Sequence, residues 1–336
     1  MKEFDLIDWI DDHFDLEQVD STGFLYNLQE SQSGECLPLI YQPFDGTQRS
    51  HFIDRGQILD FYSSVGDGWI MDFGPGDGWP SLSLSQLVSR VTGVDASQKQ
   101  ILICTENAKR LEIDNVNFVH VPAGDKLPFA DATFDGITAA SSVEQTPNPC
   151  EQLCEFYRVL KPGGRLRMYY ESLSIYRERK TEVELDLLQD VTGVLQLIIY
   201  NRIIDEGEVI QYRLTFKQPN EDLLTKLFKG NKLIQFSELS KELCDWLQPK
   251  ISNVFICHTH HPDGLTLHRW LKEIGFGIVK GTCAGGTAAA ELFSKLTPNM
   301  MKRNLEAVDE MLLPIILETI DKEIALELNP WITAVK

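Results

Sequence analysis

One aspartate and three glycines stand where the chain could turn sharply around a ligand. Residues 70–78 read IMDFGPGDG, with Asp72 two residues before Gly74 and with Gly76 and Gly78 at the next alternate positions. Glycine has no Cβ and tolerates positive φ, so the backbone at such a turn can come very close to a bound molecule. The apolar residues before the turn predict the end of a buried strand, and the leucines after it predict a helix.

The charge in front of the glycines narrows the choice of ligand. The dinucleotide fingerprint G-x-G-x-x-G would need its third glycine where this chain has Trp79. A carboxylate beside the turn would repel phosphates but attract an ammonium group. S-adenosylmethionine carries an ammonium group and no phosphate, so the turn favours this cofactor. The alternative is a glycine-rich turn that binds nothing.

A second carboxylate, Asp95, follows the glycine turn at a spacing that would place it at the end of the next strand. Asp95 lies 17 residues after Gly78, near the end of RVTGVDAS (90–97), which we expect to form a strand. The carboxyl ends of parallel strands line the ligand crevice of an α/β sheet. A carboxylate at that place can accept two hydrogen bonds from ribose hydroxyls. The alternative is an ordinary surface aspartate.

Histidines gather in one stretch, ICHTHHPDGLTLH (256–268), which holds four of the seven in the chain. They could supply a general base or hold a substrate, they could bind a metal, or they could belong to an exposed loop before a helix. The sequence alone leaves these three readings open, and we assign no metal. The candidates for a catalytic base are His258, His260, His261, Glu144 and Tyr170.

Composition restricts the class of protein. The chain has 336 residues, 43% of them hydrophobic, and a net charge of −19, which disfavours nucleic acid or an anionic membrane as the main partner. No apolar run reaches the roughly 20 residues that span a bilayer. The acidic start MKEFDLIDWIDD does not resemble a signal peptide, and the seven cysteines form no CxxC pair. We therefore expect a cytoplasmic protein with reduced thiols.

The elements that would position these residues alternate between strands and helices. Strands are expected at 69–71, 90–97, 116–123, 134–141 and 165–172, with helices at 98–112 and 150–160 between them. This order predicts an α/β fold with a mostly parallel sheet. The alternation continues with a helix at 265–276 and a sixth strand at 278–283. Residues 331–336 are expected to form a last, antiparallel strand beside the sixth.

Three segments lie outside this pattern. We expect a leading helix within 1–20, a flap at 38–52 and a helix at 53–64, so that 1–64 form an N-terminal cap. The core would comprise 65–173 and 265–336, with a helical insertion at 284–329 that Pro298 and Pro314 break. Residues 174–264 would be an insertion over the substrate site. Within it, 175–200 and 221–248 look helical and 201–216 looks like a hairpin.

The segments DFGPGDG, GVDAS, LPFADATFD, VEQ and RVLKPGGRL, in this order, resemble the class I S-adenosylmethionine-dependent methyltransferases. The similarity covers 65–172 and 265–283 and is nearest to the methyltransferase type 11 branch that includes the ubiquinone/menaquinone-biosynthesis enzymes. It implies a Rossmann-like, seven-stranded, mostly parallel sheet with helices on both faces. The implied activity is methyl transfer to a small molecule by in-line displacement. The alternatives are a protein or RNA methyltransferase and a non-catalytic binder of the cofactor.

The resemblance also implies roles for particular residues. Asp72 and the glycine backbone would hold the amino-acid end of the cofactor, Asp95 its ribose, and Ser141 would lie near the methyl group. The implied cofactor residues are Asp72, Gly74, Gly76, Gly78, Asp95, Ala96, Ala123, Gly124, Asp125 and Ser141. Two positions depart from the family. Ala123 stands where an aspartate is common, so Asp125 or the backbone of Gly124 would meet the adenine, and Gln145 replaces the usual histidine.

Apolar and aromatic residues of the 174–264 insertion could line a substrate chamber, or they could form the interface of a homodimer. These residues are Leu195, Leu197, Ile198, Ile199, Tyr200, Tyr212 and Phe216.

Overall fold

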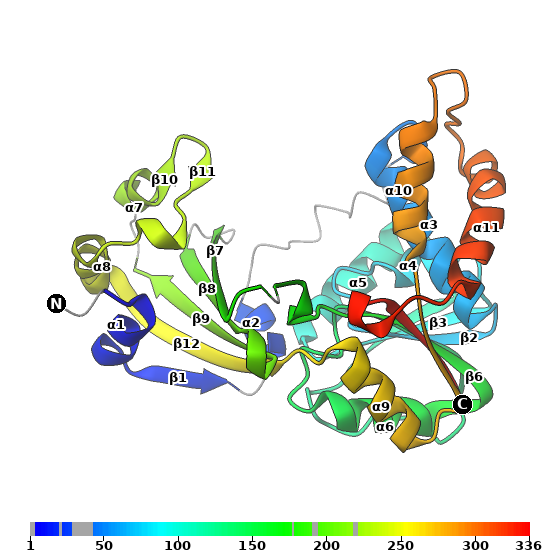
Figure 1. Ribbon diagram of the computed structural model, residues 1–336, viewed down its shortest axis with the longest axis horizontal. Coiled ribbons are helices and arrows are strands. Elements are labelled where there is room, and N and C mark those ends of the chain that lie inside the picture. Colours follow the sequence, from blue (N-terminus) through cyan, green and yellow to red (C-terminus); the bar gives the residue numbers. More distant parts are fainter. Residues whose placement is uncertain (1–3, 20–21, 29–42, 177, 190–193, 218–220) are drawn as a thin grey trace.

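The computed structural model describes residues 4–336 apart from 20–21, 29–42, 177, 190–193 and 218–220. The described residues form a seven-stranded sheet, a five-stranded sheet and a small two-stranded hairpin. The two larger sheets belong to separate lobes, with the C-terminus in the lobe of the seven-stranded sheet (Figure 1).

The seven-stranded sheet is the predicted α/β sheet. Its strand order is β13-β14-β6-β5-β2-β3-β4. Neighbouring strands are parallel except at β14, which runs antiparallel to both β6 and β13. The fold class and the antiparallel last strand are thereby confirmed. The strands are β2 (Trp69–Phe73), β3 (Arg90–Asp95), β4 (Val116–His120), β5 (Phe134–Ala140), β6 (Leu160–Tyr169), β13 (Ile278–Thr282) and β14 (Trp331–Val335).

Helices cover both faces of this sheet, because successive residues of its inner strands are apolar and point to opposite sides. Met71 belongs to one hydrophobic cluster with α6 (Pro149–Val159) and α9 (Gly264–Ile274). Its neighbour Ile70 belongs to another cluster, with α3 (Arg49–Val65) and α4 (Ser81–Leu84). Helices α10 (Gly285–Lys295) and α11 (Leu305–Asp321) pack on α3, and α5 (Gln98–Arg110) packs along β3 and β4.

A buried ion pair joins several of these elements. Arg167 on β6 donates from Nε to Asp60 Oδ1 on α3 at 2.7 Å, and both side chains are fully buried. The same guanidinium donates to the Thr282 and Thr333 hydroxyls on β13 and β14. Asp60 Oδ2 also accepts from the Gly285 N–H at 2.6 Å, where α10 begins. The pair therefore fixes α3 and α10 against one end of the sheet.

The five-stranded sheet has the order β1-β12-β9-β8-β7. It is antiparallel except that β1 runs parallel to β12. Its strands are β1 (Leu16–Val19), β7 (Thr181–Gln189), β8 (Leu195–Ile203), β9 (Glu208–Phe216) and β12 (Ile251–His260).

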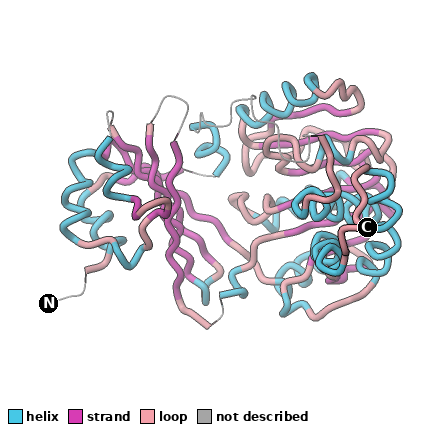
Figure 2. The backbone as a smooth tube through the Cα atoms, turned by 90° about the horizontal axis from the view of Figure 1, so that it is seen from above, coloured by secondary structure: helices cyan, strands magenta, loops and turns pink. Residues whose placement is uncertain are grey.

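Helices cover one face of this second sheet. Helices α1 (Leu6–His13), α7 (Glu221–Leu227) and α8 (Lys241–Leu247) share a hydrophobic core with it. Figure 2 shows helices on its outer side and the other lobe beyond its inner side. The short hairpin of β10 (Phe228–Lys229) and β11 (Lys232–Leu233) follows α7.

Several expectations outside the core differ from the structure. Most of 175–200, expected to be helical, forms β7 and the beginning of β8, and 221–248 is helical only in part. The expected hairpin is confirmed, with Ile203 paired to Glu208 across the turn. Pro314 lies inside α11 and does not break it. A proline removes one intrahelical bond, and the packing of α11 on α3 and α10 outweighs that loss.

The expected N-terminal cap is divided between the two sheets. Residues 6–19 belong to the five-stranded sheet and its helices, whereas α3 packs on the seven-stranded sheet. Between them lies α2 (Thr22–Leu28). Residues 38–42 of the expected flap fall outside the described part of the chain. Within that part, no helix combines the length and apolar character needed to cross a membrane.

Candidate functional site

A cavity of about 370 Å³ lies at the carboxyl ends of β2, β3, β4 and β5. The glycine turn after β2, the ends of β3 and β4, the loop after β5 and the start of α2 form its wall. The cavity brings together eight of the ten residues that the resemblance implies for cofactor binding. They are Gly74, Gly76, Asp95, Ala96, Ala123, Gly124, Asp125 and Ser141. The other two, Asp72 and Gly78, are not part of the wall.

The glycine turn has the close backbone approach that its sequence predicts. Gly74 has φ +74°, its N–H donates to the Val94 carbonyl at 2.8 Å, and a Cβ there would lie 2.4 Å from the Ser142 Cβ. Gly76 has φ +57°, and a Cβ there would meet no protein atom within 4 Å. Gly74 is therefore required for packing, whereas Gly76 leaves open space for a ligand.

Asp72 lies behind this turn and not beside the cavity. Its carboxylate accepts from the Ser81 N–H at 3.1 Å, the Ser81 hydroxyl at 2.5 Å and the Thr138 hydroxyl at 3.0 Å. Burial raises the pKa of Asp72 to about 6, although these hydrogen bonds favour the ionised form. Its geometry does not support the expected contact with an ammonium group. The side chain instead fastens the glycine turn to α4 and β5.

Gly78 also acts through packing. A Cβ at Gly78 would lie 2.5 Å from the Leu82 Cδ1 atom, so glycine allows α4 to pack closely after the turn.

Asp95 is half-buried in the cavity wall at the end of β3. Its Oδ1 accepts from the Ser97 N–H at 2.8 Å. Burial raises the pKa of Asp95 to about 6, and the backbone N–H groups of Ser97, Gly76 and Ala96 oppose that rise. The carboxylate is thus held in place by the backbone on the cavity wall, where it can accept hydrogen bonds from a ligand.

The loop after β4 forms the next part of the wall. Ala123, Gly124 and Asp125 all line the cavity, and Gly124 has φ +83°. The Asp125 N–H donates to the Pro122 carbonyl at 3.1 Å, which closes a tight turn. Gly124 and Asp125, the two residues expected to meet the adenine, therefore both line the cavity.

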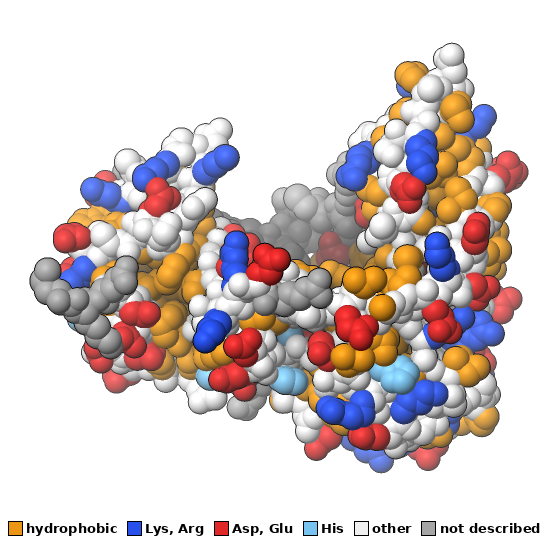
Figure 3. All heavy atoms as spheres, viewed as in Figure 1, with side chains coloured by type: hydrophobic (Ala, Val, Ile, Leu, Met, Phe, Trp, Pro, Cys, Tyr) orange, Lys and Arg blue, Asp and Glu red, His pale blue; other side chains and the backbone are white. Residues whose placement is uncertain are grey.

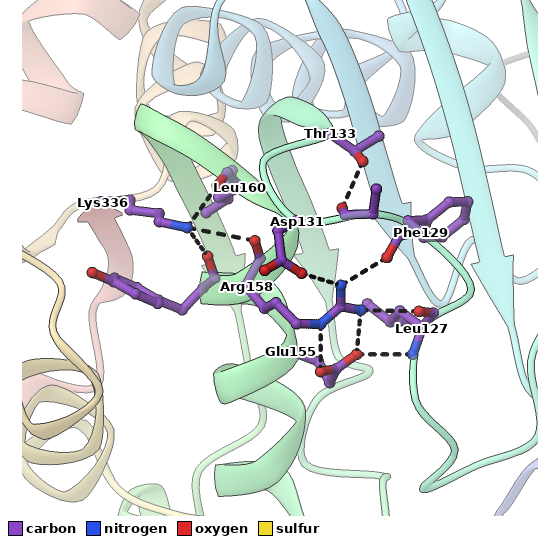
Figure 4. Close-up of polar contacts among 10 residues, drawn as sticks. Leu127, Phe129, Asp131, Thr133, Glu155, Arg158, Leu160 and Lys336 are labelled. Atoms are coloured by element: carbon purple, nitrogen blue, oxygen red, sulfur yellow. Dashed lines mark hydrogen bonds and ion pairs between the residues drawn. The ribbon is translucent and has the colours of Figure 1, made fainter.

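The LPFADATFD segment has a structural role that the sequence did not disclose. Arg158 on α6 donates to the Leu127 and Phe129 carbonyls at 2.9 and 2.7 Å and to Asp131 at 2.9 Å (Figure 4). Glu155 pairs with the same guanidinium and accepts from the Leu127 N–H at 2.9 Å. Leu127 also lines the cavity. Arg158 therefore fixes the loop that carries this part of the wall.

Two residues lie on both this cavity and a second one beside it. Thr22 at the start of α2 donates from its hydroxyl to Gln145 Oε1 at 3.2 Å. Gln145 in turn donates from Nε2 to the Ser141 carbonyl at 2.5 Å. Both residues line both cavities. Gln145, at the position where the resemblance would place a histidine, thus lies at the boundary between the two cavities.

The second cavity, of about 620 Å³, lies against the inner face of the five-stranded sheet. Strand alternation explains its wall, since side chains of period two share a face. On β8, Gln196, Ile198, Tyr200 and Arg202 alternate with residues of the outer core, and only the last three of these line the cavity. On β9, Val209, Gln211 and Arg213 line it.

The expected apolar chamber lining is therefore mostly wrong. Of the seven residues proposed from the sequence, Ile198 and Tyr200 line the second cavity. The other five pack into the outer core under α1, α7 and α8, so they are not available to a dimer interface. They are Leu195, Leu197, Ile199, Tyr212 and Phe216.

Among the histidines, His261 lines the second cavity, just after β12. Its Nδ1 lies 3.0 Å from the Glu171 carbonyl, which can only accept, so Nδ1 carries the proton. Its Nε2 then has the lone pair, 3.1 Å from the Thr259 hydroxyl. Burial lowers the pKa of His261, which favours the neutral imidazole. This residue can accept a proton at Nε2.

The other candidate bases lie on neither cavity. His258 is exposed on β12, and His260 packs near Trp270. Glu144 is 1% exposed, accepts from the Glu171 N–H at 2.7 Å, and has its pKa raised to about 7 by burial. Tyr170 is buried too, which raises its pKa. Across the described residues, no three His, Cys, Asp or Glu side chains are grouped as a metal site.

Sequence reasoning missed Arg202, Arg213, Thr22 and Gln211 as cavity residues. A signal existed in the period-two alternation of 196–202 and 208–215, which places polar residues on one face of a hairpin. The expectation of a helix over 175–200 concealed it.

Residues 71–168 match the family described as methyltransferase domain. The demethylmenaquinone methyltransferase of Listeria welshimeri is 40% identical over 76 residues, which are 23% of this chain and 32% of that protein. The 27-O-demethylrifamycin SV methyltransferase of Amycolatopsis mediterranei is 30% identical over 100 residues, which are 30% of this chain and 37% of that protein. The chain thus spans about a third of the length of the curated relatives it matches.

Among solved structures, an S-adenosylmethionine-dependent methyltransferase from Clostridium acetobutylicum is 11% identical. The match covers 86% of this chain and 91% of that one, with a TM-score of 0.49. This value is too low to add to the argument from strand order.

Proposed function

We propose that the whole chain is a class I S-adenosylmethionine-dependent methyltransferase that acts on a small molecule, because residues 71–168 match the methyltransferase domain family. The observation that carries this proposal is the pair of adjoining cavities, which share Thr22 and Gln145. One space suits the cofactor and the other suits an acceptor. Adjoining spaces let a methyl group pass from one bound molecule to the other.

The first cavity suits the cofactor both by its position at the carboxyl ends of the strands and by the chemical groups in its wall. The open side of Gly76 accommodates a ligand against the backbone, and the Asp95 carboxylate would accept from ribose hydroxyls. The turn at 122–125 would flank the adenine. Asp72 would act as a positioning residue that holds the glycine turn.

When bound, S-adenosylmethionine supplies an electrophilic methyl group on a positively charged sulfur, and the expected reaction is in-line displacement. The chain's own task is to align the acceptor and exclude water. We propose His261 as the base for a hydroxyl acceptor, whose proton its Nε2 would take while the methyl group leaves the sulfur for the acceptor oxygen. Its place on the second cavity and its neutral imidazole support this role.

The alternative substrates are less well supported. RNA needs a basic surface, whereas this chain has a net charge of −19. Figure 3 shows basic and acidic side chains interspersed on the visible face.

We also propose a cytoplasmic location. The described cysteines are free thiols, which supports this location. They are Cys104, Cys150, Cys154, Cys244, Cys257 and Cys283.

Calorimetry with S-adenosylmethionine and S-adenosylhomocysteine tests the cofactor assignment. We expect the wild type to bind in the micromolar range common for enzyme ligands. Gly76→Val fills the open side of the turn, and Asp95→Ala removes the ribose acceptor, so each should weaken binding by about 10-fold or more.

Gly230→Val is the matched control. Gly230 has φ +65°, close to the +57° of Gly76, and a Cβ there also meets no atom within 4 Å. It is not on the cavity wall, so its variant should bind as the wild type does. Unchanged affinity in both Gly76→Val and Asp95→Ala, with unchanged circular dichroism, would refute the cofactor assignment.

A further inference from the structure

Arg202 is a buried cation on the wall of the second cavity that donates no hydrogen bond to any described residue. Its side chain is 8% exposed. Nη1 lies 3.0 Å from Glu184 Oε2 without hydrogen-bond geometry, and Nη2 lies 3.6 Å from Glu171 Oε1, which is too far. Nε is buried without a partner. Leaving buried donors unsatisfied is costly, so the arrangement calls for a further acceptor.

Aromatic rings hold the guanidinium in position. Its central carbon lies 5.4 Å from the ring centroids of both Tyr176 and Tyr200. Such contacts favour one orientation of the planar group without using its N–H donors. The donors are therefore positioned before a ligand arrives.

The other polar side chains of this cavity differ in burial, and the carboxylates are the more exposed ones. Of the buried side chains, Arg213 is 2% exposed and carries only donors, whereas Gln211 and His261, at 8% and 7%, can also accept, and neither carries a negative charge. Arg213 donates to the Leu25 carbonyl at 2.8 Å, which secures α2 to the same wall. The carboxylates are nearer to solvent, with the side chains of Glu171 and Glu184 exposed by 38% and 59%. Both can turn toward water when a stronger partner occupies the cavity.

We propose that Arg202 binds a carboxylate of the acceptor, so that the second cavity selects acids over their neutral analogues. This inference rests on the proposed function and names the substrate class of the same site. The Nε–H and Nη2–H edge of a guanidinium matches the two oxygens of a carboxylate, which gives a paired, charge-assisted contact. On binding, the carboxylate takes the place near Nη2 that Glu171 now occupies at 3.6 Å.

The test uses matched acids and primary amides as probes, because the acceptor is unidentified. Benzoate with benzamide, phenylacetate with phenylacetamide, and hexanoate with hexanamide are titrated by calorimetry into the full chain saturated with S-adenosylhomocysteine. We expect the wild type to prefer acids by about 10-fold or more. Arg202→Lys keeps the charge but loses the paired edge, so its preference should fall below about threefold.

Arg179→Lys is the control, since Arg179 is exposed, pairs with Glu182 and lines neither cavity. Glu184→Gln is a second test that does not depend on the stability of the Arg202 variant. It removes a competing carboxylate and should strengthen acid binding by about threefold or more.

Three results would overturn the proposal: amides that bind as tightly as acids, no binding of any acid, or an acid preference that Arg202→Lys or Glu184→Gln leaves unchanged. Each would leave the proposed function intact as long as S-adenosylhomocysteine still binds. Failure to bind S-adenosylhomocysteine would instead count against the proposed function.

Discussion

At the scale of single residues, the site shows that similar carboxylates take different tasks. Asp72 and Asp95 both have a pKa raised to about 6 by burial. Asp72 uses its oxygens on Ser81 and Thr138, whereas Asp95 stands on the cavity wall. The direction of the side chain, and not its ionisation, separates the buried Asp72 from Asp95 on the cavity wall, and the proposed roles of the two residues follow from this difference.

Glu144 provides a test of how burial and pH act together. Its pKa is raised from 4.5 to about 7, chiefly by burial. Between these values the folded state keeps a proton that the unfolded state has released, so stability falls as pH rises. Glu144→Gln cannot ionise, and its amide can still accept from the Glu171 N–H. We expect it to gain stability relative to wild type from pH 5 to pH 8, by roughly 3 kcal/mol at most.

Urea denaturation of both proteins across this pH range measures the difference. Glu151→Gln, an exposed change on α6, should leave the pH profile as it is in wild type. A constant difference between Glu144→Gln and wild type from pH 5 to pH 8 would contradict the expectation.

The expected site residues that do line the first cavity are those set by short spacing. Gly74, Gly76 and Asp95 line the cavity because a strand end and the turn after it place them there. The position of Asp72 behind the wall depends on Ser81 and Thr138, and the latter comes from β5, far along the chain. Arg202 could not be identified from the sequence, because its environment is formed by residues from separate parts of the chain. These are Glu171, Tyr176, Glu184 and Tyr200.

At the scale of elements, the core alternation of strands and helices was predictable and the second sheet was not. Buried parallel strands between amphipathic helices leave a clear pattern in 65–173. In 181–200, leucine and glutamate favour helices by local propensity, yet β7 and β8 form. Pairing with β9, and burial of alternate residues against α1 and α8, override that propensity.

The ion pair between Arg167 and Asp60 makes an element-scale prediction. Asp60→Ala leaves a fully buried guanidinium without its carboxylate and removes the acceptor at the start of α10. We expect a loss of about 3–5 kcal/mol in the free energy of unfolding, measured by urea denaturation. Glu291→Ala breaks an exposed pair with Lys295 on α10 and should change little. Equal stability of the two variants would argue against a role of the buried pair in joining α3, β6 and α10.

At the scale of the whole molecule, α2 connects the two cavities. Asn27 accepts from the Ser97 hydroxyl at 2.8 Å and from the Lys99 N–H at 3.2 Å, beside the first cavity. Leu25 accepts from Arg213 on the other sheet at 2.8 Å. A short helix thus contacts both lobes through hydrogen bonds at Leu25 and Asn27.

Gly23→Val tests this connection. A Cβ at Gly23 would lie 2.8 Å from the Ala96 Cβ, so a larger side chain must displace α2 from the wall after Asp95. We expect calorimetry to show weaker binding of S-adenosylhomocysteine, by about 10-fold, with little change in global stability. Gly277→Val is the control, because the nearest atom to a Cβ there is 3.9 Å away. Wild-type affinity in Gly23→Val would show that α2 does not support the wall of the first cavity.

The two-sided character of β8 has a consequence for how such a protein can diversify. Ile198, Tyr200 and Arg202 line the second cavity, which we propose as the acceptor site, while Leu195, Leu197 and Ile199 pack in the core of the lobe. Substitutions at alternate positions of β8 would therefore change which methyl acceptors bind without altering the hydrophobic core of the lobe. A mutational library confined to those inward positions should retain folded members while shifting their preference among acceptors.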